Sequence, residues 1–247
     1  MDGAWQTFPR LAAKAISTRS GLWYGHLMAY LPVWLRVDGE PCVVVGGGAV
    51  ATRKVAALLA AGARVTVVAP RVSAALSGRA AAGEIALEAR PYRAGDLLGA
   101  RLAFAATDDE ALHARLARDA AAANVPLNVV DRPAWCSFIV PAVLRRGALS
   151  IAVSTEGHSP ALAGRVRDDI DARLGPEYER AVALLGRLRR HLQAGSLPSA
   201  ERQRILTRLA ASDLLERLRQ PDAAAVDRLL AEHAGAGVSL AALDAEL

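Results

Sequence analysis

The segment from Cys42 to Ala51 constrains the fold of this chain more than any other stretch. Its sequence, Cys-Val-Val-Val-Gly-Gly-Gly-Ala-Val-Ala, passes from β-branched apolar residues into three glycines, and a helical pattern begins directly after them. A short apolar run closed by glycines is typical of a buried parallel strand that ends in a tight turn. Gly46, Gly48 and Ala51 fit the pattern G-x-G-x-x-A, in which the small residues allow the turn, the approach of a pyrophosphate and close helix packing.

A glycine triplet alone also fits an ordinary strand–helix turn, so the interpretation depends on the residues after it. Val55, Leu58 and Leu59 lie at helical spacing on one face, and Gly62 stands where a C-terminal capping glycine belongs. The β-branched residues 65–68 (Val-Thr-Val-Val) then predict a second strand. Together these features complete a β-α-β unit, which favours a dinucleotide-binding site whose phosphates meet the free N–H groups of the helix N-terminus.

Strands and helices continue to alternate as far as Asp131. Thr107 is predicted to be the N-cap of one helix, with Glu110 completing a capping box, and this helix is expected to end near Asn124. The other predicted elements are a helix at 73–82 and strands at 85–88, 102–106 and 127–130. This order predicts an α/β fold with a doubly wound, Rossmann-type parallel sheet.

The pattern changes after Pro133. Residues 138–140 and 149–153 predict two strands that are too close in sequence for a crossover helix, and we interpret them as a pairing surface for a second subunit. Ser159 and Pro160 are typical of a helix start. The expected parts are an N-terminal extension at 1–29 (a loose tail or an extra helix), a Rossmann domain at 30–136, a dimerisation segment at 137–175 and a helical C-terminal domain at 176–247.

Composition argues against several classes of protein. No run of about 18 apolar residues suggests a membrane span. Two cysteines, Cys42 and Cys136, imply no disulfide framework or zinc site and suit a reducing cytoplasm. The net charge is +5, but the arginines are not grouped with aromatic residues, so we expect no nucleic-acid partner and no membrane partner. The histidines lack metal-ligand spacing, so no metal site is predicted; His113 is expected on a helix surface and His158 in a loop.

Five short motifs occur one after another in a fixed order. They are Val45–Lys54 (VGGGAVATRK), Ala106–Asp109 (ATDD), Asn128–Asp131 (NVVD), Ser137–Pro141 (SFIVP) and Ser159-Pro160. In this order, over about residues 30–220, the chain resembles the precorrin-2 dehydrogenase family of siroheme synthesis, including the N-terminal half of siroheme synthase. The resemblance implies NAD-dependent oxidation of precorrin-2 to sirohydrochlorin in a homodimer. It also implies insertion of ferrous iron, a step that some members of the family lack.

The resemblance also implies which residues form the site. Asp131 matches the family's catalytic aspartate, which would take a ring proton as hydride leaves or a pyrrole proton during metal insertion. Without the resemblance, Asp131 would be interpreted as a turn or cap residue. The implied cofactor-binding residues are Gly46, Gly48, Ala49, Val50 and Ala51 for the pyrophosphate, with Pro70, Arg71 and Thr107 beside them.

The segment Val68-Ala69-Pro70-Arg71 stands where an acidic residue ordinarily binds the ribose hydroxyls. Because no carboxylate occurs there, Arg71 is either a solvated loop residue or one that accommodates a 2′-phosphate, which leaves NADP open beside NAD. Three hydroxyl groups are candidates for contact with substrate carboxylates, namely those of Ser137, Thr155 and Ser159.

Two other functions fit the same pattern. One is a regulatory module that senses NAD(H) without turnover, in which residues 137–175 serve only for dimerisation. The other is a dehydrogenase for a different small anionic substrate. An assay with precorrin-2 and NAD distinguishes them.

Overall fold

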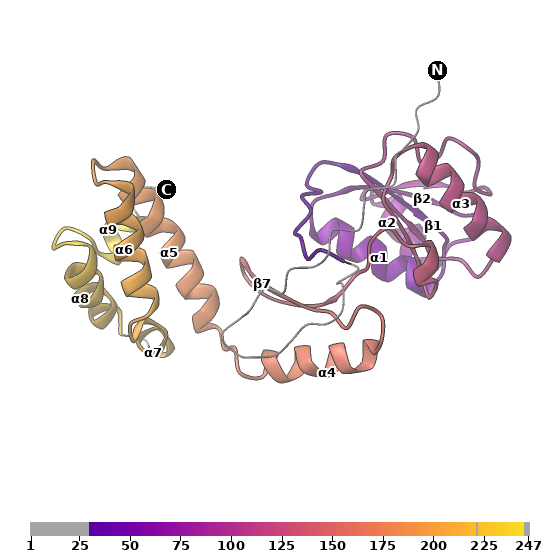
Figure 1. The fold of residues 1–247 in the computed structure, drawn as a ribbon. Coiled ribbons are helices and arrows are strands. Elements are labelled where there is room, and N and C mark those ends of the chain that lie inside the picture. The colour runs from indigo at the N-terminus through magenta and orange to yellow at the C-terminus, as the bar shows by residue number, and fades with distance from the viewer. Residues whose placement is uncertain (1–29, 221, 245–247) are drawn as a thin grey trace, which may run out of the picture. The chain divides into compact units, whose positions relative to one another are not determined.

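The computed structural model describes residues 30–220 and 222–244, so the expected N-terminal extension at 1–29 lies outside the described residues. The described chain divides into two compact units, of which the first ends at Ile139 and the second begins at Val140. The first unit contains the parallel sheet, and the second contains a hairpin followed by helices (Figure 1). Among the described residues, no helix is long and apolar enough to cross a membrane.

The first unit is built around a five-stranded parallel sheet with the strand order β3-β2-β1-β4-β5. The strand that runs into the glycines, β1, lies at the centre, between β2 and β4. The chain reverses its direction of strand addition beside β1, which confirms the predicted doubly wound sheet. The strands are β1 (Pro41–Val45), β2 (Arg64–Val68), β3 (Ala86–Glu88), β4 (Leu102–Ala105) and β5 (Leu127–Val129).

The apolar run of β1 is continuous because both faces of the sheet are covered. Alternate residues of β1 point into two cores. One core is shared with helices α1 (Ala49–Ala60) and α2 (Ala74–Ala81), and the other with helix α3 (Glu110–Ala122). The glycine loop therefore leaves the centre of a three-layered unit.

The start of α3 differs from the prediction. Asp109, not Thr107, is the N-cap, and its carboxylate accepts a hydrogen bond from the Leu112 N–H at 3.0 Å. The Thr107 hydroxyl instead accepts from the Asp109 N–H at 3.4 Å. The prediction was wrong because the turn after β4 is two residues longer than expected, and this turn brings the Asp109 side chain to the open end of the helix. The predicted end of α3 near Asn124 is confirmed.

The second unit begins with an antiparallel hairpin of β6 (Ala142–Arg146) and β7 (Leu149–Val153). The predicted strand at 138–140 is therefore wrong. The backbone of this segment bonds to a side chain instead of to a neighbouring strand, because the Phe138 carbonyl accepts a hydrogen bond from Nδ2 of Asn128, in β5, at 3.0 Å. A short 3-10 helix (Pro133–Trp135) precedes this segment, and helix α4 (Pro160–Asp171) follows the hairpin, capped by Ser159 as predicted.

The rest of the described chain is helical, as predicted from Glu177 onwards. Glycine and proline predict breaks at 195–198, at Pro221 and at 235–237. The first and the last of these separate helices, and Pro221 lies outside the described residues. A further turn at 211–213 contains neither glycine nor proline and was not predicted. Inward-facing leucines give these helices a core of their own. The helices are α5 (Glu177–Ala194), α6 (Ser199–Ala210), α7 (Leu214–Arg219), α8 (Ala223–Ala234) and α9 (Leu240–Asp244).

Candidate active site

A cleft of about 620 Å³ opens in the first unit at the carboxyl ends of the parallel strands. It is lined by the glycine loop after β1, by the segment after β2 and by the start of α3. Ligands of open α/β sheets bind at this edge, where the strand order reverses. The cleft is therefore in the position that the glycine pattern predicts.

The three glycines of the loop have different structural roles. Gly46 has a φ of +127°, and a Cβ there would lie 2.0 Å from the carbonyl oxygen of Ala106, directly after β4. A Cβ on Gly47 would lie 2.0 Å from the carbonyl oxygen of Arg71. A Cβ on Gly48 would have no described atom within 4 Å, apart from those of its two chain neighbours. The first two glycines thus permit close backbone packing, and the third leaves room before the unpaired N–H groups that begin α1.

The structure brings most of the predicted cofactor-binding residues together. Those that line the cleft are Gly46, Gly48, Pro70, Arg71 and Thr107. Ala49, Val50 and Ala51 do not line it. Ala51 is fully buried in the core between α1 and the sheet, so its small side chain serves the packing of the helix on β1.

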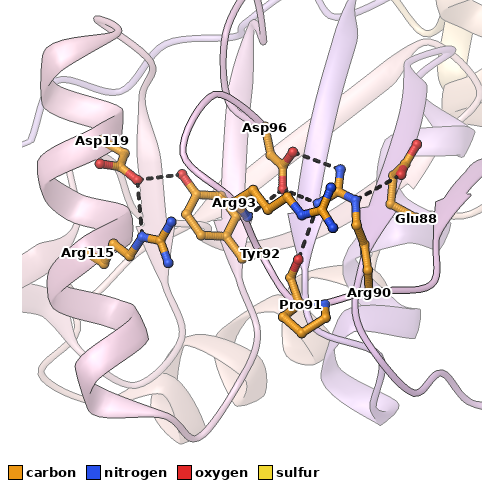
Figure 2. A network of polar contacts seen from close by, with 8 residues as sticks. All are labelled: Glu88, Arg90, Pro91, Tyr92, Arg93, Asp96, Arg115 and Asp119. Carbon is orange, nitrogen blue, oxygen red and sulfur yellow. Dashed lines mark hydrogen bonds and ion pairs between the residues drawn. The ribbon is translucent and has the colours of Figure 1, made fainter.

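A network of charged groups lies beside the cleft (Figure 2). Arg90 donates hydrogen bonds to both carboxylate oxygens of Asp96, at 2.8 and 2.9 Å, and contacts the carboxylate of Glu88 at 3.2 Å. The bonds from Arg90 are the main cause that lowers the pKa of Asp96. Arg90 therefore neutralises two acidic residues at this side of the sheet.

Tyr92 and Arg115 form one wall of the cleft. The Tyr92 hydroxyl donates to a carboxylate oxygen of Asp119 at 2.9 Å, and the Arg115 guanidinium lies 5.2 Å from the centroid of the Tyr92 ring (Figure 2). Burial, followed by the hydrogen bond to Asp119, raises the pKa of Tyr92. The phenol therefore stays a neutral donor, and the wall is held in place before any ligand arrives.

His113 is buried, in contrast to the predicted surface position. Only 4% of the residue is exposed, and Nε2 lies 2.8 Å from the carbonyl oxygen of Thr107. Nδ1 has no hydrogen-bond partner within the described chain. The helical spacing to Leu116 and Ala120 could have revealed this inward position, because all three residues share one face of α3. His113 thereby fixes the backbone at Thr107, on the lip of the cleft.

Asp131, the predicted catalytic residue, follows β5 in a turn and has a φ of +59°. This left-handed conformation is tolerated better by Asp and Asn than by other side chains. The residue is exposed and does not line the cleft beside the glycine loop. It nevertheless lies at the carboxyl edge of the sheet, the edge from which the glycine loop also emerges.

Lys54 is a feature of this edge that the sequence pattern did not single out. Its half-buried ammonium lies 5.1 Å from the centroid of the Phe104 ring and makes no hydrogen bond or ion pair with any described residue. Burial is the main cause that lowers the pKa of Lys54, while the charges of Cys136 and Asp131 act in the opposite direction. One signal was available: Lys54 is one of two lysines among 30 basic residues.

The hydroxyl groups considered for substrate contact already bind the backbone. Ser137 Oγ accepts from the Leu127 N–H at 2.7 Å, and Thr155 Oγ1 accepts from the Ser159 N–H at 3.1 Å. Ser159 itself caps α4, and His158 lies in a turn, as expected. Within residues 30–220 and 222–244, no three His, Cys, Asp or Glu side chains are grouped as metal ligands.

Two family models match consecutive parts of the chain. The model described as "putative NAD(P)-binding" matches residues 33–142, and the model described as "sirohaem biosynthesis protein central" matches residues 146–173. The first match includes the glycine loop and the whole cleft. The second includes the hairpin strand β7 and helix α4.

The chain is also similar to curated siroheme synthases. The siroheme synthase of Pseudomonas aeruginosa (strain PAO1) is 38% identical over 213 residues, which are 86% of this chain and 46% of the relative. The siroheme synthase of Methylobacillus flagellatus is 41% identical over 162 residues, 66% of this chain and 35% of the relative. The chain thus spans less than half the length of these curated relatives.

A solved structure, titled SirC, precorrin-2 dehydrogenase, matches with a TM-score of 0.64 and 27% identity, covering 77% of this chain and 96% of that chain. The match extends over nearly all of that protein. The chain therefore belongs to the family that comprises the precorrin-2 dehydrogenases and the corresponding part of the siroheme synthases.

Proposed function

We propose that this chain catalyses the NAD-dependent dehydrogenation of precorrin-2 to sirohydrochlorin, a step of siroheme biosynthesis. The observation that carries the proposal is the match to the precorrin-2 dehydrogenase SirC over 96% of that chain. In this reaction the tetrapyrrole loses a hydride, which passes to NAD, and a proton, which passes to a base. We assign the activity to the cytoplasm, because Cys42 and Cys136 are unpaired thiols.

NAD, when bound in the cleft, supplies the acceptor for the hydride. The chain's own part is to hold the dinucleotide. The first N–H groups of α1 lie behind the open space at Gly48, and the partial positive charge of the helix N-terminus favours a pyrophosphate there. On the other side of β1, the Thr107 backbone is held by His113. Little rearrangement of the walls is therefore needed for binding.

We assign the proton acceptor to Asp131. Its carboxylate, on an exposed residue at the sheet edge, is available to a ring proton of a bound tetrapyrrole. Lys54 adds positive charge at the same edge, and its ammonium has no anionic partner among the described residues. An unpaired cation suits a substrate that carries many carboxylates. Lys54 is therefore assigned to substrate binding and Asp131 to proton transfer.

We further propose that the chain acts as a homodimer through residues 137–175. Leu162 and Val166, one turn apart on α4, are 54% and 37% exposed, and Val143 on β6 is 38% exposed. Their side chains give the predicted dimerisation segment exposed apolar surface. A second copy that covers this surface would remove it from water and protect the edges of the two-stranded hairpin.

Insertion of ferrous iron into sirohydrochlorin is a further reaction that we propose, with iron as a substrate. Entry of Fe²⁺ displaces two pyrrole protons. We assign Asp131 to accept them one at a time, with the first passed to solvent before the second is taken. This step is measured separately, from the appearance of siroheme when sirohydrochlorin and ferrous iron are supplied without NAD. It is independent of the dehydrogenase reaction, which needs no iron.

The test is an anaerobic assay of the full chain with precorrin-2 and NAD. NADH should appear together with the spectrum of sirohydrochlorin. Asp131→Asn, which suits the same left-handed backbone, should lose at least about a hundredfold in rate while NAD affinity stays within about twofold. Binding of NAD without formation of NADH would favour a sensing module. Normal turnover of Asp131→Asn would remove Asp131 as the base.

A further inference from the structure

The cleft has an unusual charge where the adenosine ribose is expected. In Rossmann sites an acidic residue beyond the second strand binds the ribose hydroxyls of NAD, whereas an arginine nearby accommodates the 2′-phosphate of NADP. Here β2 ends at Val68, and the segment that follows it carries no carboxylate. Pro70 and Arg71 of this segment are exposed and line the cleft. The only charge that the segment presents to the cleft is therefore positive.

The acidic residues on the β3 side of this segment are engaged by another cation, Arg90 (Figure 2). Glu88 pairs with Val68 in the register of β2 and β3, but its carboxylate contacts Arg90 at 3.2 Å. Asp96 accepts hydrogen bonds on both of its oxygens from the same guanidinium. Neither acidic residue lines the cleft. Arg90 therefore pairs with both carboxylates on this side of the segment.

The acidic residues that do line the cleft, Asp108 and Asp109, belong to a different strand end. They follow β4, which is separated from β2 by the central strand β1. The carboxylate of Asp109 is occupied as the N-cap of α3. Neither of them makes an ion pair or hydrogen bond with Arg71.

Arg71 itself is unpaired and is carried by a fixed backbone. Its guanidinium makes no hydrogen bond or ion pair with any residue that the structure describes. The Ser73 N–H donates to the Gly47 carbonyl at 2.8 Å, and the hydroxyl oxygens of Ser73 and Thr52 lie 3.0 Å apart. The segment after β2 is thereby bound to the glycine loop and to α1. An arriving phosphate would need to order only the Arg71 side chain.

We infer that the cleft accepts a 2′-phosphorylated dinucleotide, NADP, and that Arg71 binds its 2′-phosphate. The inference deepens the proposed function and rests on it, because both place the dinucleotide in the same cleft. A guanidinium can bind two phosphate oxygens through parallel N–H···O bonds. NAD remains a ligand, since its ribose hydroxyls meet no unfavourable charge at this position.

Calorimetric titration of the full chain with NAD and with NADP tests the inference. In the wild type, the dissociation constant of NADP should lie within about threefold of that of NAD. Arg71→Gln should weaken NADP binding by about tenfold or more and change NAD binding by about twofold or less, because it removes charge-assisted hydrogen bonds made only to NADP. Arg71→Lys keeps the charge without the two-pronged geometry, so its loss of NADP affinity should be smaller than that of Arg71→Gln.

Arg101→Gln is the matched control. Arg101 is exposed, and its backbone N–H donates to the Pro41 carbonyl at the start of β1, the opposite edge of the sheet from the cleft. Its loss should leave both affinities unchanged. NADP binding weaker than NAD binding by more than about tenfold in the wild type, or equal losses of both ligands in Arg71→Gln, would overturn the inference and leave the NAD-dependent function intact. Binding of neither dinucleotide would overturn both.

Discussion

Gly48→Asp should strongly weaken dinucleotide binding and leave the fold intact. No described atom other than those of its chain neighbours lies within 4 Å of the Gly48 Cβ position, and its φ of −84° suits any residue. Gly48 is also the N-cap of α1, and no side chain caps that helix. Aspartate is favoured at an N-cap over glycine by a few tenths of a kcal/mol. The variant should therefore fold and be at least as stable as the wild type.

The same carboxylate would compete with the pyrophosphate. It would accept hydrogen bonds from the N–H groups at the start of α1 and place a negative charge beside the phosphates. Two like unit charges about 4 Å apart repel by about 4 kcal/mol at an effective dielectric constant of about 20. This repulsion corresponds to a loss of about a thousandfold in affinity. Gly48→Ala adds only a methyl group to open space and should lose far less.

Calorimetric titration with NAD measures the affinity of both variants, and thermal unfolding reports on the fold. Gly47→Ala provides the contrast, since its Cβ would lie 2.0 Å from the Arg71 carbonyl oxygen and 2.8 Å from Val72 Cα. That variant should unfold at a lower temperature, because two backbone segments would have to move apart. A Gly48→Asp protein that binds NAD within about tenfold of the wild-type affinity would refute the assignment of the pyrophosphate to this loop.

Three further predictions concern other parts of the chain. Leu162→Asp should convert the dimer into a monomer at micromolar concentration in sedimentation, whereas Leu98→Asp, at an exposed leucine outside the segment 137–175, should not; a monomeric wild type would contradict the proposed interface. Lys54→Met should raise the KM for precorrin-2 and leave NAD affinity unchanged, and an unchanged KM would exclude Lys54 from substrate binding. Glu177→Gln should lower the unfolding temperature at neutral pH, because its own backbone N–H and then Arg219 lower the pKa of the Glu177 carboxyl from its ordinary 4.5. Because the folded-state pKa lies below the unfolded value of 4.5, the ionised carboxylate stabilises the folded protein above pH 4.5, and this stabilisation is lost as the carboxylate is protonated. The unfolding temperatures of the wild type and of Glu177→Gln should therefore converge as the pH falls below 4.5. A constant difference between them would count against a role of the Glu177–Arg219 pair.

The sequence by itself determined the architecture of the first unit. The passage from the β1 valines into Gly46 and its neighbours, followed by the helical spacing of α1 and a second apolar strand, is a local pattern. Parallel strands can be joined only by crossovers, and these crossovers are right-handed, so a repeated strand–helix alternation leaves few topologies. For this reason the Rossmann sheet, the carboxyl edge and the place of the cleft follow from neighbouring residues alone.

Other features depend on contacts between residues far apart in the sequence, and only the tertiary structure decided them. Residues 138–140 have the composition of a strand, but the side chain of Asn128 binds the Phe138 carbonyl across ten positions, and the hairpin forms further along the chain. His113 is polar, yet its buried position and its bond to Thr107 arise from the packing of α3 on the sheet.

The charge of the cleft is also a tertiary property. Arg71 lines it unpaired among the described residues, while Arg90, which follows β3, pairs with both Glu88 and Asp96. The sequence contains all four of these charges within a short stretch. It does not specify which of them pair, because pairing depends on which strand ends the sheet brings together.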